Sequence, residues 1–151
     1  MRIFEVMSED VATIEPTATT AAARQLMRSK GINHLVVMRD RELVGIVSSR
    51  DLPDDATRGR RSRTAVKDVM HGRVVTTGPK TLVTKAANLM AGRSVGSLVV
   101  TARGKVLGIV TVTDLLRLVG RGAGRQPKRA ARPTLRTTVP HRKQHRAGGA
   151  W

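Results

Sequence analysis

The spacing of hydrophobic residues predicts strands and helices in alternation along the first half of the chain. Residues 11–14 form a short apolar stretch that Pro16 stops, as expected of a brief strand. Apolar residues then recur at helical spacing up to Lys30-Gly31, where a cation and a glycine are typical of a helix C-terminus. Two apolar runs, 35–38 and 43–48, flank a polar turn and predict a hairpin. The residues expected on the buried helix face are Ala22, Ala23, Leu26 and Met27.

The second half repeats this pattern at a shift of 63 residues, without a gap. Gly45 falls on Gly108, and Met27 falls on Met90. Two copies are too few for a solenoid of stacked repeats. The sequence therefore predicts two halves of one pseudo-symmetric domain, with Met27 and Met90 in its core.

Hydroxyl side chains near the expected helix starts predict how the helices are capped. A threonine there can accept a hydrogen bond from a free backbone N–H group. Thr17 or Thr19 is the expected cap of the first helix. Thr81 is the candidate cap of the second helix, which is expected from Leu82 to about Ala91.

Each half ends in a strand that leads, through a hydroxyl residue, to an aspartate three positions later. Ser48 and Asp51 hold these places in the first half, and Thr111 and Asp114 hold them in the second. This arrangement suits a polyhydroxyl ligand such as ribose, because an ionised carboxylate accepts O–H donors side by side. The alternative role of the two aspartates is to cap helices. In that role Asp51 would open a short helix and Asp114 would cap a helix over Leu115–Val119.

Charge is distributed unevenly along the 151 residues, whose formal net charge is +17. All 11 Asp and Glu residues lie at or before Asp114, whereas nine Lys and Arg residues follow from Arg121 onwards. Gly120 is expected to close the last helix. Because the segment after it has three prolines and no apolar period, residues 121–151 are expected to be a disordered basic tail. This tail is either a solvated charged extension or an anion-binding arm.

Composition also argues against several classes of protein. The hydrophobic content of 40% is enough for a core, but Phe4 and Trp151 are the only aromatic residues, which argues against stacking platforms for single-stranded bases. There is no cysteine and no set of residues at metal-ligand spacing, and Ser48 has no recognisable base, so neither a metal site nor an enzyme is expected. The sequence has no apolar run of about 18 residues, so no membrane span is expected. The start of the chain does not resemble a signal peptide, so a cytoplasmic location is the expectation.

The repeat resembles the cystathionine β-synthase (CBS) domain in tandem, the arrangement called a Bateman module. The resemblance covers about residues 3 to 119. It rests on Asp68-Val69-Met70, on the Thr-x-x-Pro spacing at 13–16 and 76–79, and on the Gly-hydrophobic-hydrophobic-Ser/Thr-x-x-Asp ends of both halves. It implies a mixed α/β (α+β) fold of two β-α-β-β-α units packed sheet to sheet about a pseudo-twofold axis. It also implies disc-shaped dimers and two clefts that bind AMP, ADP, ATP or S-adenosylmethionine.

The resemblance also assigns roles to individual residues. Asp51 and Asp114 would hold the ribose hydroxyls, with Ser48 and Thr111 on the same edge. Neither strand start carries the Arg or Lys found in many nucleotide-binding members. Arg50 precedes Asp51, whereas a threonine precedes Asp114, so the two clefts should differ in anion affinity. The remaining candidates are Thr13, Ile14, Thr76 and Thr77 near the base, Asn33 and His34 with Gly96 and Ser97 at the strand starts, and the cations Arg50 and Arg93.

The expected function is that of a stand-alone regulatory module that binds an adenosine nucleotide or derivative and signals to a partner. It would not be an enzyme, would need no cofactor, would form a homodimer and would act on a regulated protein that the sequence does not identify. The alternative is a nucleic-acid- or polyanion-binding protein that acts through its tail. The expected domains are residues 1–58, 59–120 and 121–151.

Overall fold

The computed structural model describes residues 1–54 and 63–124. Each regular element of the first half returns in the second half at the shift of 63 residues that the sequence shows. The first half contains β1 (Thr13–Ile14), α1 (Thr20–Lys30), β2 (His34–Arg39) and β3 (Glu42–Ser48). The second half contains β4 (Thr76–Thr77), α3 (Val83–Arg93), β5 (Ser97–Ala102), β6 (Lys105–Thr111) and α4 (Val112–Gly124). Within the described residues, single turns of 3₁₀-helix complete the order: η1 (Ile3–Glu5), η2 (Ser49–Asp51) and η4 (Val66–Asp68).

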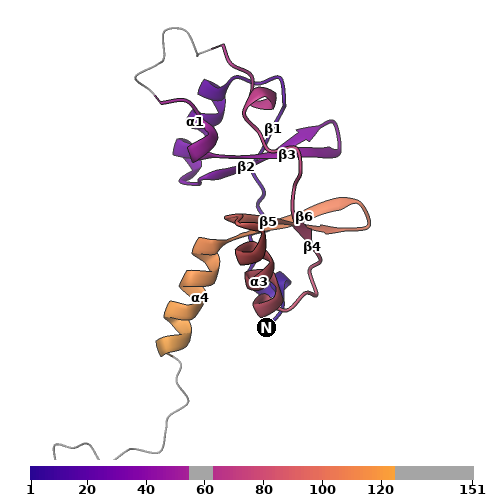
Figure 1. Ribbon diagram of the computed structural model, residues 1–151, viewed down its shortest axis with the longest axis vertical. Coiled ribbons are helices and arrows are strands. Elements are labelled where there is room, and N and C mark those ends of the chain that lie inside the picture. Colours follow the sequence, from indigo (N-terminus) through magenta and orange to yellow (C-terminus); the bar gives the residue numbers. More distant parts are fainter. Residues whose placement is uncertain (55–62, 125–151) are drawn as a thin grey trace, which may run out of the picture.

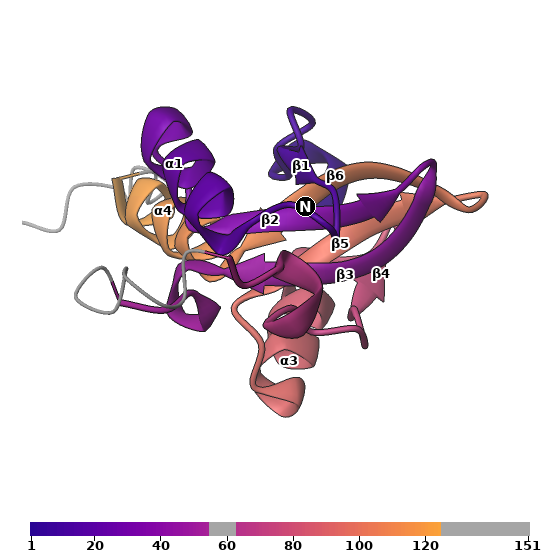
Figure 2. The ribbon, with the colours of Figure 1, turned by 90° about the horizontal axis from the view of Figure 1, so that it is seen from above.

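The strands form two three-stranded sheets of the same topology. In each sheet the central strand pairs in parallel with the short first strand and antiparallel with the third, in the orders β1-β2-β3 and β4-β5-β6. The sheets stack face to face, with α1 on the outer side of one and α3 on the outer side of the other (Figure 1). The view from above shows α1 and α3 at opposite edges of the stacked sheets (Figure 2). This is the mixed α+β fold of two β-α-β-β-α units that the resemblance implies. The last helix of the second unit is α4, and the 3₁₀ turn η2 follows β3 in the first unit.

Successive side chains of the central strands point to opposite faces of each sheet, and the apolar ones are buried on both faces. Leu35 and Val37 of β2 point toward α1 and belong to the first core cluster. Val36 points to the opposite face, yet it is fully buried, and its counterpart Val99 is buried in the same way. The two sheets therefore cover one another with small β-branched residues.

One hydrophobic cluster lies between each sheet and its helix, and the two clusters confirm the predicted core positions of Met27 and Met90. Met27 is buried in the first cluster, and Met90 is buried in the second. The predicted helix face is correct for Ala23 but wrong for Ala22, which is exposed. Leu26 is only partly buried against the first cluster. The helix therefore buries a narrower stripe than the spacing suggested.

The leading 3₁₀ turns of the two halves are exchanged between the two clusters. Ile3 of η1 is fully buried in the second cluster, and its backbone N–H donates to the carbonyl of Thr81 at 2.9 Å. Val66 of η4 is fully buried in the first cluster, and its N–H donates to the carbonyl of Ala18 at 2.8 Å. Each packed unit thus contains a turn from the other half, although the expected domain limits remain a prediction from the sequence.

The glycines that open the repeated motif lie where the chain after each leading turn crosses a sheet. Ser8 forms a bridge with Ile109, and His71 forms the corresponding bridge with Ile46. A Cβ atom on Gly108 would lie 2.8 Å from both the carbonyl oxygen of Ser8 and a side-chain sulfur. Since real Cβ atoms essentially never approach that closely, this crossing requires glycine.

The caps of the first helix confirm the sequence prediction, whereas the cap predicted for the second helix is wrong. The Thr19 hydroxyl accepts from the N–H of Ala22 at 3.1 Å, and Gly31 ends α1 in the left-handed conformation with φ 63°. Leu82 holds the corresponding cap position of α3, and no side chain caps that helix. Thr81 falls one residue short, because the counterpart of Thr19 in the repeat is Leu82.

The last helix is longer than the sequence indicated. α4 begins at Val112 and runs through Gly120 to Gly124, so Gly120 does not end it and the predicted tail cannot begin at Arg121. A glycine inside a helix costs only about 1 kcal/mol relative to alanine, and packing of Leu115 against the second cluster helps to hold the helix. Figure 1 shows α4 leading away from the second sheet. Residues 125–151, the rest of the predicted tail, lie outside the described residues.

Among residues 1–54 and 63–124, no helix has the length and hydrophobicity needed to cross a membrane.

Candidate functional site

The first candidate carboxylate, Asp51, closes the 3₁₀ turn that follows β3. Its Oδ2 atom accepts hydrogen bonds from the Ser48 backbone N–H at 2.8 Å and from the Ser48 hydroxyl at 2.9 Å. Its Oδ1 atom lies 3.0 Å from Nε2 of His71. Asp51 therefore ends a turn instead of opening a helix as expected, and it bonds back to the end of the strand. We call Asn33, His34, Ser48, Arg50 and Asp51 the Asp51 site.

The second candidate carboxylate, Asp114, forms the same local arrangement with Thr111. Its Oδ2 atom accepts from the Thr111 N–H at 2.8 Å and from the Thr111 hydroxyl at 2.9 Å, while the Asp114 N–H donates to that hydroxyl at 3.2 Å. The Asp114 side chain is thus not the predicted N-cap, because it lies in the third position of α4 and completes a reciprocal capping pair. Only Oδ2 is used in this way. We call Gly96, Ser97, Thr111 and Asp114 the Asp114 site.

Backbone hydrogen bonds join each strand start to the turn that carries the carboxylate. The carbonyl of Asn33 accepts from the N–H of Ser49 at 2.9 Å, and the carbonyl of Gly96 accepts from the N–H of Val112 at 3.0 Å. His34 pairs in register with Ser48. The structure therefore brings together the predicted residues at the strand starts and the predicted hydroxyl and carboxyl residues.

His34 lies where the two sites adjoin. A Cβ atom on Gly96 would be 3.5 Å from Nε2 of His34. Burial lowers the pKa of His34 below its usual 6.5, and the Arg50 cation acts in the same direction. The charges of Asp51 and Asp114 oppose this effect, so both carboxylates act on one imidazole. The neutral imidazole is the favoured form of His34 in the folded protein.

Asp51 is held in its ionised form by its hydrogen-bond donors. Burial alone would raise its pKa, but the bonds from the Ser48 N–H, from His71 and from the Ser48 hydroxyl outweigh burial and lower the pKa below 3.8. An ionised carboxylate is acceptor-only and offers about four lone-pair positions. Asp51 is thus an acceptor for hydroxyl or amine donors near neutral pH.

The other predicted residues are placed farther from the carboxylates or have no described link to them. Thr13 and Ile14 form β1, and Thr76 and Thr77 form β4, each across the central strand from the strand that leads to the carboxylate. Arg50 is exposed in η2 and close enough to act on His34. Arg93 is exposed at the end of α3, and within the described residues no hydrogen bond or ion pair joins it to Asp114. Its role remains a prediction.

His71 is the one residue of this region that the sequence analysis missed. It lies directly after the Asp68-Val69-Met70 motif and 20 residues from Asp51. The repeat itself carries a usable signal, because the residue at the matching position of the first half is Ser8. A titratable side chain that is present in one copy and absent from the other marks a position where the two halves differ.

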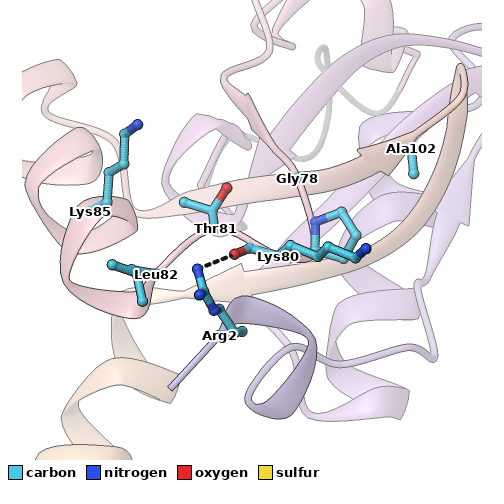
Figure 3. Close-up of a pocket in the computed structure, with 8 residues that line it drawn as sticks. Arg2, Gly78, Lys80, Thr81, Leu82, Lys85 and Ala102 are labelled. Carbon is cyan, nitrogen blue, oxygen red and sulfur yellow. Dashed lines mark hydrogen bonds between the residues drawn. The ribbon is translucent and has the colours of Figure 1, made fainter.

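A separate hollow of about 620 Å³ lies at the start of α3, away from both carboxylates. Figure 3 shows Arg2, Lys80 and Lys85 around it, with the Arg2 side chain donating to the Lys80 carbonyl at 3.0 Å. None of the predicted site residues lines it. The hollow is therefore separate from both carboxylate sites.

Comparison with known protein families decides the classification. The profile of the CBS domain matches residues 3–53 and again residues 66–121. This chain belongs to the CBS domain family. The two matches coincide with the two halves of the repeat, so the chain carries a CBS pair, as the resemblance implied.

Relatives of this CBS pair include much longer enzymes and a protein of similar size. Over 122 residues it is 32% identical to a homoserine O-acetyltransferase of Methanosphaerula palustris, and over 107 residues it is 36% identical to an inosine-5′-monophosphate dehydrogenase of Korarchaeum cryptofilum. The matches cover 80% and 70% of this chain but only 24% and 22% of those enzymes. The CBS domain-containing protein YhcV of Bacillus subtilis is 29% identical over 114 residues, which are 75% of this chain and 81% of YhcV. The match therefore spans about a quarter of each enzyme and most of YhcV.

Solved structures of CBS pairs have the same fold. The CBS domain pair of protein MJ0100, solved with 5′-methylthioadenosine and S-adenosylmethionine, superposes with a TM-score of 0.72 at 24% identity, covering 81% of this chain and 98% of that one. The CBS domain protein NE2398 also gives a TM-score of 0.72, at 26% identity, covering 79% of this chain and 97% of its own. These likenesses confirm the fold expected from the sequence.

Proposed function

We propose that this CBS pair is a regulatory module that binds an adenosine derivative through the ribose, with the Asp114 carboxylate as the main acceptor. The observation that carries the proposal is that the two carboxylate oxygens of Asp114 differ in their hydrogen bonds. Thr111 fixes Oδ2 by two hydrogen bonds, while Oδ1 accepts no hydrogen bond from the described residues. A ribose offers two neighbouring O–H donors, which match the two lone pairs of one carboxylate oxygen.

The kind of ligand is supported by a neighbouring structure. The CBS pair of MJ0100 was solved with two adenosine derivatives, 5′-methylthioadenosine and S-adenosylmethionine. In our proposal the base lies toward the threonines of β1 and β4, and phosphate or other anionic groups lie toward the strand starts. Arg50 makes the Asp51 site the more favourable of the two for an anion. Homodimer formation and signalling to a partner protein belong to the same proposal.

A calorimetric titration with adenosine, AMP, ATP, S-adenosylmethionine and 5′-methylthioadenosine tests the proposal. Asp114→Ala is expected to weaken binding by about 1.5–3 kcal/mol, the range for a hydrogen bond to a charged group, or roughly 10- to 150-fold. Asp114→Asn is the matched variant. Its amide oxygen can still accept from Thr111, but its NH₂ group then faces the ribose donors.

The pair of variants separates binding from capping. Asp114→Asn should keep wild-type stability and lose affinity, whereas Asp114→Ala should lose affinity and about 1 kcal/mol of capping. Unchanged affinity in folded Asp114→Asn would remove ribose binding from this residue. If none of the five compounds bound the wild-type protein, the proposed function itself would be wrong.

A second candidate function rests on charge alone. Eight Lys and Arg residues and no acidic residue lie between 125 and 151. We propose this segment as an arm for nucleic acid or another polyanion, with affinity that falls steeply with salt.

A further inference from the structure

The position of His71 is one at which the two halves of the repeat differ, because its counterpart in the first half is Ser8. After each leading turn the chain crosses the third strand of a sheet and forms a bridge there. Ser8 bonds to Ile109 through N–H and carbonyl at 2.9 and 3.0 Å, and His71 bonds to Ile46 at 2.9 and 3.0 Å. The backbones of Ser8 and His71 are therefore held in the same way. Only the side chains differ, a short hydroxyl in one half and an imidazole in the other.

The imidazole reaches the carboxylate of its own site. Nε2 of His71 lies 3.0 Å from Oδ1 of Asp51, a normal hydrogen-bond distance. Asp51 thus receives two bonds from Ser48 on Oδ2 and one from His71 on Oδ1. With about four lone-pair positions on a carboxylate, one acceptor position remains on Oδ1 of Asp51.

The carboxylate of the other site keeps two positions. The nearest cation to Oδ1 of Asp114 in the described chain is Nη1 of Arg117, at 3.9 Å, which is too long for a hydrogen bond. The Arg117 side chain is 69% exposed, so this ion pair is weak and easily displaced. A ribose can therefore donate both hydroxyls to Asp114 without displacing a hydrogen bond, but at Asp51 it must displace His71.

We propose that His71 ranks the two sites: it acts as an intramolecular competitor for the Asp51 carboxylate and makes the Asp51 site the weaker ribose site. This inference rests on the proposed adenosine function. His71 is a specificity-determining residue here, because it occupies an acceptor position on the Asp51 carboxylate that stays open on the Asp114 carboxylate. The competitor is 66% exposed and Asp51 is 18% exposed, so the pair is a partly solvated one that a ligand can open.

The test isolates each site and exchanges the two side chains. The ligand is adenosine, which has no phosphate, so that Arg50 does not bias the comparison. In an Asp114→Ala background only the Asp51 site remains, and adding His71→Ser is expected to tighten adenosine binding about 1.5- to fivefold, the fold-change of a partly exposed ion pair. In an Asp51→Ala background only the Asp114 site remains, and adding Ser8→His is expected to weaken binding by a similar factor.

The outcomes distinguish this inference from the function on which it rests. Tightening by His71→Ser together with weakening by Ser8→His supports the inference. Unchanged affinity in both exchanges, or weaker binding in His71→Ser, would overturn it and leave adenosine binding intact. Weaker binding would mean that the imidazole contacts the ligand. If adenosine and the other adenosine derivatives failed to bind any of these folded variants or the wild type, the proposed function would fail first.

Discussion

The close crossing at Gly108 provides a sharp test of the packing. In Gly108→Ala, the new Cβ atom would lie 2.8 Å from the Ser8 carbonyl oxygen and 2.8 Å from the Met7 sulfur. The flexible methionine can turn away, but the carbonyl belongs to a backbone that two hydrogen bonds to Ile109 hold in place. Reaching an ordinary contact of 3.4 Å would require the bridge to move by about 0.6 Å.

The expected cost follows from these contacts. Overpacking of this kind costs about 1–3 kcal/mol, and each strained bridge bond contributes about 0.5–1.5 kcal/mol. Alanine recovers about 0.4–1 kcal/mol by restricting the unfolded chain. We therefore expect Gly108→Ala to lower the free energy of unfolding by about 1–5 kcal/mol. Gly45→Ala should cost less, because its Cβ atom would lie 3.1 Å from the His71 carbonyl and its closest neighbour is the movable Met70 sulfur.

Urea unfolding followed by circular dichroism measures the effect, with Gly92→Ala as the matched control. Gly92 lies within α3, and a Cβ atom there meets nothing within 4 Å, so alanine should stabilise the protein by about 0.5–1 kcal/mol. The midpoint for Gly108→Ala should fall by an amount on the order of 1 M, while that for Gly92→Ala should rise. A midpoint for Gly108→Ala at or above that of the wild type would refute the reasoning about the crossing.

Three further predictions follow from the fold and the charges. Met27→Ala should lower the free energy of unfolding by about 2–5 kcal/mol because Met27 is buried. If Met27→Ala destabilised the protein no more than Leu26→Ala, whose side chain is only partly buried, the assigned core would be contradicted. Since the folded pKa of His34 is lowered from 6.5, the protein should lose stability as pH falls from 6.5 through that folded value, and His34→Ser should flatten this part of the urea-midpoint profile. An unchanged profile would count against a half-buried neutral imidazole near Arg50, Asp51 and Asp114. Deleting residues 125–151 should leave adenosine affinity unchanged and flatten the salt dependence of DNA binding, whose slope is about −0.9 per phosphate contact; equal slopes would eliminate the arm.

The repeated pattern made most of the fold predictable. One hydrophobic pattern occurs twice at a constant shift, so each element supported its twin. The hairpin strands were placed to within one or two residues because turn residues bound the apolar runs. The length of α4 was not predictable from the pattern, since Gly120 is a typical helix end, whereas the helix continues to Gly124. The cap of α3 was misplaced by one residue because Thr81 stands beside the true cap position.

The candidate site divides in the same way into local and distant parts. The bonds from Ser48 to Asp51 and from Thr111 to Asp114 span three residues, so they depend on local spacing alone. The sequence analysis placed each pair on one edge but assigned the side chains to a ligand and not to one another. The bond from His71 to Asp51 spans 20 residues and depends on how the chain crosses the sheet. No periodicity encodes such a crossing, and for the same reason the burial of Ile3 in the opposite cluster could not be foreseen.

The exchange of leading turns has a consequence for the protein if its chain is cut. Cleavage between residues 54 and 63 would give two fragments. Each fragment would lack the 3₁₀ turn whose buried residue completes its hydrophobic cluster. Ile3 would remain with the first fragment and Val66 with the second, so each fragment would carry the piece that the other needs. Such fragments should be unstable alone and should reassociate when mixed, as in a split reporter. The two halves of the CBS pair are therefore held together by packing as well as by the connecting chain, so a break in that chain need not separate the halves.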